Sequence, residues 1–413
     1  MKSKSVISLV VLVALVRAGL AQDSSEPLTV QRVVDTYVAK NLELQAAEHR
    51  LERTRADQIA ARLRLNPGLT FTAENLKISG PALPFNRLYE FGASYSETIE
   101  LGGKRKLRQS VADLTVSAAE AQFADTMRRG IAEVKRLYFD ALLARYTIDV
   151  AVENRQTFEQ LVQFNLARFR EGAIPEWDVI KVRLERIKFD AAIRQAQLSE
   201  RQAVIRLVER LGESTFNKDI AGQMDFRTID ADAERLKQTA LVERPDIQAA
   251  ERDLQAANER LALEQARKRP DLTPFIGYKR LASDNTVMFG VSTPLKIRDR
   301  NEAGIARAQA DQKAAQSQLE LMRNRAIAQV ESAIAAYQSA REQVQTFRNE
   351  LLNEADESRS IALAAYQEGA TPLLAVLDAQ RTRSEVRQQY FRTLFDYQVS
   401  LIDLELAVGK ELQ

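Results

Sequence analysis

Few side chains in this sequence have the type and spacing that chemistry requires. The chain has 413 residues but one histidine, His49, no cysteine and five methionines. Metal ligands normally come in clusters, so His49, in a stretch rich in Glu and Arg, is predicted to be a surface residue and no metal site is expected. The lack of cysteine excludes thiolate catalysis and disulfides. No nucleophile, base and acid form a recognisable set, so we expect a protein that is not an enzyme and needs no cofactor.

Phosphate and nucleic-acid binding are not indicated either. Gly102 and Gly103 form a glycine pair, but the spaced motif of a phosphate-binding loop is missing, so a bend between a strand and a helix is expected there. The 59 Lys and Arg residues balance 57 Asp and Glu residues. This balance gives no reason to expect nucleic acid as a partner.

The first residues have the pattern of a secretory signal peptide. Lys2 and Lys4 precede an apolar run at 6–16, and small residues at 19–21 offer a cleavage point. The run is too short to span a bilayer, so residues 1–21 are predicted to be a signal peptide rather than an anchor. No later segment reaches the roughly 18 apolar residues of a transmembrane helix. A membrane location would therefore require β-strands, and hence an outer membrane.

The sequence contains an internal repeat, in which one unit occurs twice. The motif QAAE at 45–48 recurs at 248–251, and EGAIP at 171–175 recurs as EGATP at 368–372. The order and spacing of these matches predict an internal duplication. The two structural repeats are expected at 22–213 and 214–413.

Long helices should dominate each repeat. Between 104 and 171 the only Gly or Pro is Gly130, and between 305 and 368 there is none. At 1.5 Å per residue each stretch could reach on the order of 100 Å. In the second repeat apolar residues step by threes and fours, close to a coiled-coil heptad. They are Leu319, Met322, Ala326, Val330, Ala333, Tyr337, Ala340, Val344, Phe347 and Leu351. Each long helix should end at a repeated Gly and restart at the following Pro, giving helical hairpins with tips at about 171–175 and 368–372.

Each repeat also has a stretch in which apolar and polar residues alternate, as in a strand. The predicted β-hairpins lie at about 68–101 and 271–297, with loops at 77–87 and 281–285. Pro274 should interrupt the first strand of the second hairpin. Such alternation suits the wall of a water-filled membrane barrel, although a ribbon packed on a helical domain would show it too.

Four strands cannot close a membrane barrel, because about eight is the smallest number that does. Several chains would therefore have to share one barrel, and three chains would supply about twelve strands. The expected fold class is mainly α with a small β part. Duplicated coiled-coil hairpins would form a periplasmic α-barrel, and four strands per chain would contribute to a trimeric 12-stranded outer-membrane β-barrel.

At this point the sequence resembles the TolC-type outer-membrane efflux factors over nearly all of the mature chain. Two motifs are similar to the branch that serves heavy-metal (cobalt-zinc-cadmium and copper-silver) resistance-nodulation-division pumps. They are IELGGKR at 99–105 and PLKIRDRN at 294–301, followed by Gly304. The resemblance implies a homotrimer whose helical tips meet a periplasmic adaptor (membrane fusion) protein, which joins it to an inner-membrane pump. On this basis Gly172, Ala173, Gly369 and Ala370 are the expected adaptor contacts.

The resemblance also implies a narrow end lined by acidic residues. Asp378, and Asp178 as its counterpart in the first repeat, are the candidates for this lumen constriction. Ala375 stands where some family members have another Asp. For both candidates a solvated helix face or an interhelical ion pair remains the alternative. Trp177, the only tryptophan, is expected to pack inside its hairpin rather than to contact the adaptor.

The function predicted from these features is passive export. The chain would be the outer-membrane channel of a tripartite efflux system, carrying heavy-metal cations from the periplasm to the exterior. The alternative is a secreted coiled-coil scaffold or a periplasmic adaptor protein. An adaptor should have one helical hairpin flanked by compact β-domains rather than two hairpins in duplicated repeats.

Overall fold

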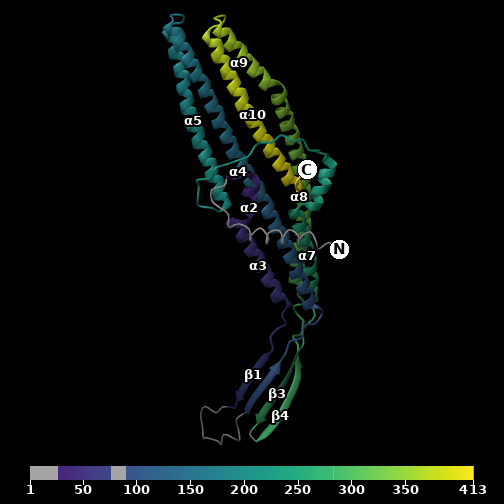
Figure 1. Cartoon of the computed structure of the whole chain (residues 1–413). Coiled ribbons are helices and arrows are strands. Elements are labelled where there is room, and N and C mark those ends of the chain that lie inside the picture. The colour runs from purple at the N-terminus through teal and green to yellow at the C-terminus, as the bar shows by residue number, and fades with distance from the viewer. Residues whose placement is uncertain (1–26, 76–89, 282, 413) are drawn as a thin grey trace. The chain divides into compact units, whose positions relative to one another are not determined.

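The computed structural model describes residues 27–75, 90–281 and 283–412. The expected signal peptide at 1–21 and the expected hairpin loop at 77–87 lie outside the described residues. The helices and strands follow one another along the chain as Figure 1 shows. The helices are α2 (Val30–Lys40), α3 (Leu42–Arg62), α4 (Lys104–Arg170), α5 (Glu176–Leu211), α6 (Ala233–Glu243), α7 (Pro245–Ala266), α8 (Glu302–Thr346), the π-helix η2 (Phe347–Leu351), α9 (Leu352–Gln367) and α10 (Leu373–Val408). The strands are β1 (Gly68–Glu74), β2 (Glu90–Ser96), β3 (Thr273–Leu281) and β4 (Asp284–Ser292).

The chain divides into two compact units, and each unit draws on both halves of the sequence. The first comprises Met1–Ala47, Ala124–Arg244 and Asn324–Gln413. The second comprises Glu48–Phe123 and Pro245–Arg323. The long helices α4 and α8 begin in the second unit and run into the first. The compact units are therefore built by pairing equivalent parts of the two sequence halves.

Glycine and proline set the ends of the helices at corresponding places in the two halves. Pro175 precedes α5 and Pro372 precedes α10, and both have φ −74° and ψ 155°. The two helices end at Gly212 and Gly409, with φ of 79° and 85°. Glycine reaches this left-handed region without the strain that a Cβ would cause.

The heptad pattern read along α8 corresponds to a buried stripe. Ala326, Val330, Tyr337 and Val344 are all fully buried. The helix does not continue as one α-helix to 368, because the π-helix Phe347–Leu351 separates α8 from α9. A π turn fits an extra residue into the helix and rotates the side chains that follow it.

The four strands form one antiparallel sheet in the order β1-β2-β3-β4. β3 continues through Pro274, which pairs with Val291 in β4 and accepts a hydrogen bond from the backbone N–H of Glu97. The expectation that Pro274 interrupts this strand is therefore wrong. Pro274 lies at the second position of β3, where a missing N–H donor costs the sheet little.

The strand-to-helix junction of the second unit is held by a partly buried lysine. Gly102 and Gly103 both adopt φ of 74° and form the predicted bend just before α4. Lys104 then donates hydrogen bonds to the carboxylate of Asp271 (2.8 Å) and to the carbonyl oxygen of Arg269 (2.6 Å). The same carboxylate accepts from the backbone N–H of Leu101 (2.9 Å). One carboxylate thus ties the end of the first hairpin to the start of β3.

Candidate functional site

The sheet has one strongly apolar face. Successive strands align Leu69, Tyr95, Ile276 and Phe289 in one row, and the register alternates such rows with polar ones. These side chains are exposed in the single chain, and Phe289 reaches 85% exposure. A contiguous apolar surface of this kind indicates a partner or a lipid environment rather than water.

The opposite face of the sheet is small and polar. Its rows include Thr70, Ser94, Gly277 and Met288 side by side, and Thr72 beside Gly92. A Cβ on Gly92 would lie 2.5 Å from the hydroxyl oxygen of Thr72, and one on Gly277 would lie 3.0 Å from the Cβ of Ser94. The side chains of Thr72 and Ser94 therefore pack directly against these glycines, and small hydroxyl-bearing side chains line this face of the sheet.

The outer strands of the sheet, β1 and β4, each pair on one side only within the described chain. Unpaired backbone donors and acceptors at such edges are unsatisfied unless water or another strand meets them. Lipid supplies neither, so an apolar sheet with two open edges requires further strands to complete it.

The two helical tips have the same backbone design. Gly172 and Gly369 adopt φ of 73° and 79°, and both are exposed. The N–H of Ala173 donates to the carbonyl oxygen of Arg168, and that of Ala370 to the carbonyl oxygen of Ala365, each at 2.8 Å. These bonds close the last turn of α4 and of α9 and present the four expected adaptor residues at the surface.

The two candidate constriction residues lie near the start of α5 and α10. Asp178 is half-buried in the first turn of α5, and Asp378 is exposed on α10. Within the part of the chain that the structure describes, neither carboxylate forms a salt bridge, and no hydrogen bond joins the two. The described chain therefore offers no ion pair to explain either residue, and a lumen role and a solvated helix face stay the two interpretations.

The tip region contains a polar contact that the sequence did not indicate. The hydroxyl of Tyr366 donates to the side-chain oxygen of Asn165 at 2.5 Å, and Asn165 is fully buried. Burial raises the pKa of the Tyr366 hydroxyl, the Arg168 guanidinium opposes that rise, and the Asp178 carboxylate adds to it. The Arg168 guanidinium also lies over the rings of Phe164 (5.7 Å) and Tyr366 (5.3 Å). This contact joins the hairpin of the first half to that of the second.

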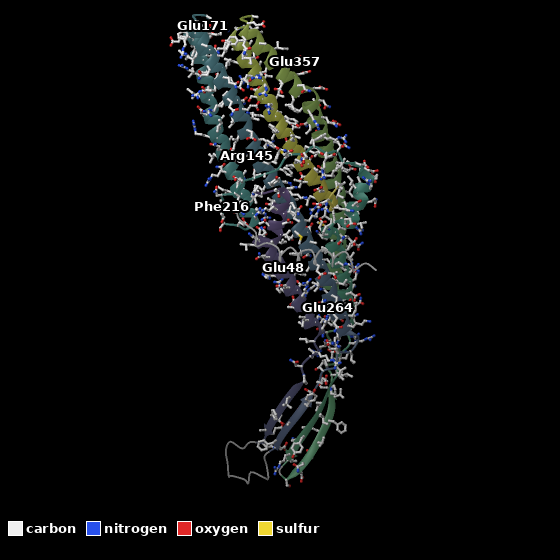
Figure 2. The ribbon with its side chains drawn as sticks, viewed as in Figure 1. Glu48, Arg145, Glu171, Phe216, Glu264 and Glu357 are labelled. Atoms are coloured by element: carbon white, nitrogen blue, oxygen red, sulfur yellow. The ribbon has the colours of Figure 1, made fainter. Side chains whose placement is uncertain are left out.

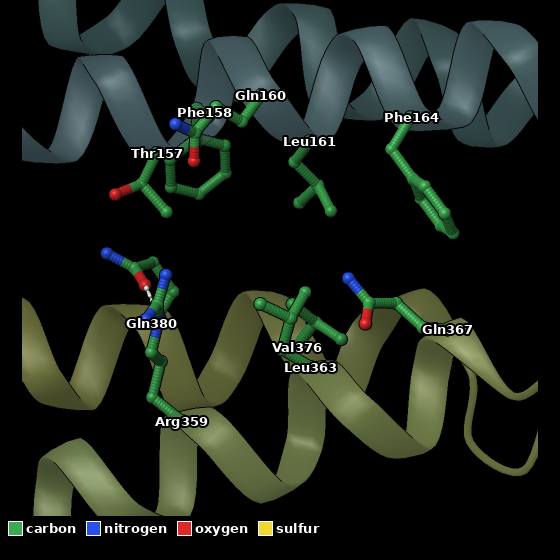
Figure 3. A pocket seen from close by; sticks show the side chains of 10 residues that line it. All are labelled: Thr157, Phe158, Gln160, Leu161, Phe164, Arg359, Leu363, Gln367, Val376 and Gln380. Carbon is green, nitrogen blue, oxygen red and sulfur yellow. Dashed lines mark hydrogen bonds between the residues drawn. The ribbon is translucent and has the colours of Figure 1, made fainter.

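A pocket of about 100 Å³ lies between α4 on one side and α9 and α10 on the other (Figure 3). Phe158, Leu161 and Phe164 line it from α4, and Arg359 and Gln380 line it from the second half. Gln380 bonds to Asn154 (3.0 Å) and accepts from Arg359 (3.2 Å). The pocket thus borders a buried polar layer within the helical bundle.

Trp177 and His49 are both at the surface. Trp177 is 66% exposed, so the expectation that it packs inside its hairpin is wrong. His49 is exposed and contacts Glu52 at 2.9 Å. No group of three or more potential metal ligands is found among the described residues.

No helix within the described residues has both the length and the hydropathy to cross a membrane.

A sequence model of the outer membrane efflux protein family matches residues 33–213 and 236–410. The match covers most of the chain, so this protein belongs to the outer membrane efflux protein family. It therefore acts in efflux at the outer membrane. The family assignment favours a channel over the scaffold and the adaptor that the sequence left open.

Individual relatives agree with this assignment. The chain is 27% identical to the cobalt-zinc-cadmium resistance protein CzcC of Cupriavidus metallidurans over 381 residues, which cover 90% of this chain and 88% of the relative. It is 26% identical to the cation efflux system protein CusC of Escherichia coli K12, over 68% of this chain and 64% of the relative.

Solved structures show the same fold. A crystal structure of CusC superposes with a TM-score of 0.75 at 20% identity, covering 95% of this chain and 96% of that one. The outer membrane protein VceC of Vibrio cholerae gives a TM-score of 0.75 at 17% identity, covering 93% of this chain and 97% of that one. The fold is thus that of outer-membrane efflux channels.

Proposed function

We propose that three copies of this chain form one export channel. The observation that carries the proposal is the four-stranded sheet, which has an exposed apolar face, a polar face and two open edges. Three such sheets supply about twelve strands, enough to close a barrel around a water-filled lumen. In that barrel the row containing Phe71 and Val287 faces lipid, and the hydroxyl-rich face lines the lumen.

The rest of the channel is a helical duct in the periplasm. The tips at 171–175 and 368–372 dock onto a periplasmic adaptor through Gly172, Ala173, Gly369 and Ala370. The adaptor connects the duct to an inner-membrane resistance-nodulation-division pump, which supplies the energy. The exposed glycine turns support this role, because they leave backbone and small side chains open to a partner.

The proposed cargo is heavy-metal cations. This choice is supported by the names of the relatives, which are resistance proteins for cobalt, zinc and cadmium and a cation efflux protein. Asp178 and Asp378 form the cation-attracting constriction near the tips, where rings of carboxylates from several copies favour cations over anions. Asp378→Asn should reduce the preference of the reconstituted pore for cations. Glu234→Gln, on α6, serves as a control that should leave that preference unchanged.

We also propose that the chain has a cleaved signal peptide and an internal duplication. Residues 1–21 are removed as a signal peptide, and the mature chain consists of repeats at 22–213 and 214–413. The matching glycine caps of α5 and α10 support the duplication. The intact mass and the first residues of the mature protein test the cleavage point.

The first experiment measures the mass of the mature protein extracted from outer membranes in mild detergent, corrected for bound detergent. The proposal requires a trimer. A monomer, or a protein found only in the soluble periplasm, would reject it.

A second experiment tests which face of the sheet meets lipid. Phe71→Asp and Phe289→Asp place a carboxylate on the apolar face and should prevent stable insertion, because a charge in the bilayer interior costs a few kcal/mol. Thr70→Asp and Met288→Asp are matched controls one residue away on the other face, and these variants should insert. Equal insertion of all four variants would show that the sheet does not face lipid.

A further inference from the structure

Helix α5 has two apolar faces, and only one of them is covered within the chain. The buried face consists of Val179, Val182, Ala196, Ala203, Val204, Leu207, Val208 and Leu211. On the opposite side of the helix, Trp177, Ile180, Leu184 and Ile187 are 66%, 42%, 56% and 53% exposed. They step by three and four residues, which is the spacing of a helix-packing seam. A single exposed apolar residue needs no explanation, but a continuous stripe indicates a partner. We call these four residues the α5 stripe.

Helix α9 and the π-helix before it carry an exposed stripe of the same spacing but different chemistry. The α9 stripe consists of Glu350, Glu354, Glu357, Ile361 and Ala364, all of which are exposed. Figure 2 labels Glu357 on the side of α9 that is turned away from α10. Within the described residues none of the three glutamates forms a salt bridge. This edge of the bundle therefore offers acidic and apolar groups that the single chain does not use.

The two stripes lie on opposite edges of one layer of helices. In the tip half of the first unit the helices follow in the order α5, α4, α10, α9 (Figure 1). Away from the tips the contacts agree with this order: Arg155 of α4 pairs with Asp190 of α5 at 2.9 Å, and Asn154 of α4 donates to Ser384 of α10 at 2.7 Å. At the tips α9 also reaches α4, through Tyr366 and Arg168. When such layers are joined into a ring, α5 of one copy meets α9 of the next.

We infer that the α5 stripe of one copy packs against the α9 stripe of its neighbour, in a register that the tips define. This inference rests on the proposed ring of three copies. A closed ring is generated by rotation alone, so facing groups lie at the same height along the axis. Two unpartnered stripes on the two edges of one layer then become the two sides of one seam.

The heights can be compared because the two tips are level. The guanidinium of Arg168, four residues before Gly172, donates to the carbonyl oxygen of Tyr366, three residues before Gly369 (3.1 Å). α5 leads away from one tip glycine and α9 leads toward the other, and both advance about 1.5 Å per residue. A residue n positions after Gly172 on α5 should therefore face the residue n positions before Gly369 on α9 of the neighbouring copy.

This rule matches the two stripes residue by residue. Ile180 and Ile361 both lie eight residues from their tip glycine. The other pairs, each equally far from the tip glycines, are Trp177 with Ala364, Leu184 with Glu357, and Ile187 with Glu354. No adjustment is needed to bring the two heptad patterns into step. The seam is apolar next to the tips and becomes mixed further from them.

The mixed part of the seam is complemented by charge. Arg183 lies next to Leu184 on α5 and is exposed. Lys188 lies next to Ile187 and also pairs with Glu185 of its own helix at 2.6 Å. In the proposed register these two cations flank Glu357 and Glu354 of the neighbouring copy. Basic groups beside an apolar seam that meet acidic groups across it are the usual way in which helices select a partner and a register.

Disulfide cross-linking tests the register directly, because the natural chain has no cysteine. The Ile180→Cys/Ile361→Cys double variant, oxidised in isolated outer membranes, should give covalent dimers and trimers that reductant reverses. The matched control, Ile180→Cys/Glu354→Cys, moves one partner by seven residues, about 10 Å along the helix. A disulfide cannot span that offset, so the control should stay monomeric on a denaturing gel.

Charge exchange gives a second readout that does not depend on cysteine chemistry. Arg183→Glu should lower the fraction of trimer in mild detergent several-fold, and Arg183→Glu/Glu357→Lys should restore it. Failure of the double variant to recover would contradict the proposed pairing.

The outcomes separate this inference from the proposed function. A trimer in which the Ile180→Cys/Ile361→Cys variant forms no cross-link, or in which the displaced pair cross-links instead, overturns the register but leaves the channel intact. If the Ile180→Cys substitution leads to a cross-link with a different protein, the α5 stripe belongs to that partner and the inference fails. A monomer by mass rejects the proposed function itself.

Discussion

The contact between Gly130 and Tyr37 makes a quantitative prediction about the first unit. Gly130 lies inside α4, where Ala would raise helix propensity by about 1 kcal/mol. A Cβ at that position, however, would lie 1.8 Å from the hydroxyl oxygen and 2.3 Å from Cζ of Tyr37. Tyr37 is 1% exposed, and the guanidinium of Arg210 lies over its ring at 5.9 Å, so the ring has no free space to enter. Overpacking of this kind costs about 1–3 kcal/mol, and α4 stays helical when α2 opens, so Gly130→Ala should weaken the docking of α2 by about 1–3 kcal/mol.

Trypsin cleavage after Lys40, followed by mass spectrometry on the protein in mild detergent, measures that docking. Lys40 ends α2, so cleavage there requires local opening of the helix. A loss of about 1–3 kcal/mol should speed the cleavage about 5- to 150-fold. Cleavage after Arg170, at the tip, serves as an internal control and should keep its rate.

The decisive variant removes the aromatic ring of Tyr37. In a Tyr37→Ala background Gly130→Ala no longer meets an obstacle, so it should become stabilising by about 0.5–1 kcal/mol through helix propensity alone. Because α4 stays helical when α2 opens, the effect of Gly130→Ala on cleavage after Lys40 should then disappear. If Gly130→Ala accelerates cleavage equally with and without the ring, the contact with Tyr37 is not the reason that glycine stands at this position.

Two further substitutions probe buried polar groups of the first unit. Gln380→Leu should destabilise the helical bundle by about 1–3 kcal/mol, since it leaves the buried side-chain oxygen of Asn154 without its donor. Thermal unfolding against the exposed control Gln388→Leu measures this difference. Burial raises the pKa of Glu405 despite the nearby Lys135, so its ionisation lowers stability as pH rises through the raised value. Glu405→Gln should therefore be more stable than the natural protein at neutral pH, and the gap should close below the ordinary carboxyl pKa of about 4.3. A gap that persists or widens at pH 3 would contradict that explanation.

Features that depend on local sequence could be predicted well. The helix ends at Gly172 and Gly369 and the bend at Gly102 and Gly103 follow from glycine's access to positive φ. The buried stripe of α8 follows from its apolar spacing. Membership of the efflux family, indicated by the motifs, was confirmed by the family match.

Other features could not be read from the sequence for physical reasons. Nothing in the Gly and Pro pattern marks the π-helix Phe347–Leu351, because a π turn needs no special residue. The packing of Trp177 was mispredicted because both faces of α5 are apolar, and helical spacing alone cannot say which face the chain covers. The bonds of Tyr366 to Asn165 and of Gln380 to Asn154 link positions about 200 residues apart, so finding them requires the relative heights of two hairpins.

The arrangement of charge suggests where selection occurs along the proposed duct. Most side chains on the polar face of the sheet are Gly, Ser or Thr, which bind cations weakly. Two carboxylates on that face, Glu74 and Glu90, form salt bridges with Lys279. In the proposed channel Asp178 and Asp378, which have no salt-bridge partner within the described residues, supply negative charge near the tips. In the proposed duct the tips are the entrance and the sheet is the exit. Attraction of cations at the entrance and weak contact at the exit favour passage of the cargo over its retention. Selectivity should therefore change with substitutions near the tips and stay unchanged with Ser94→Ala in the sheet.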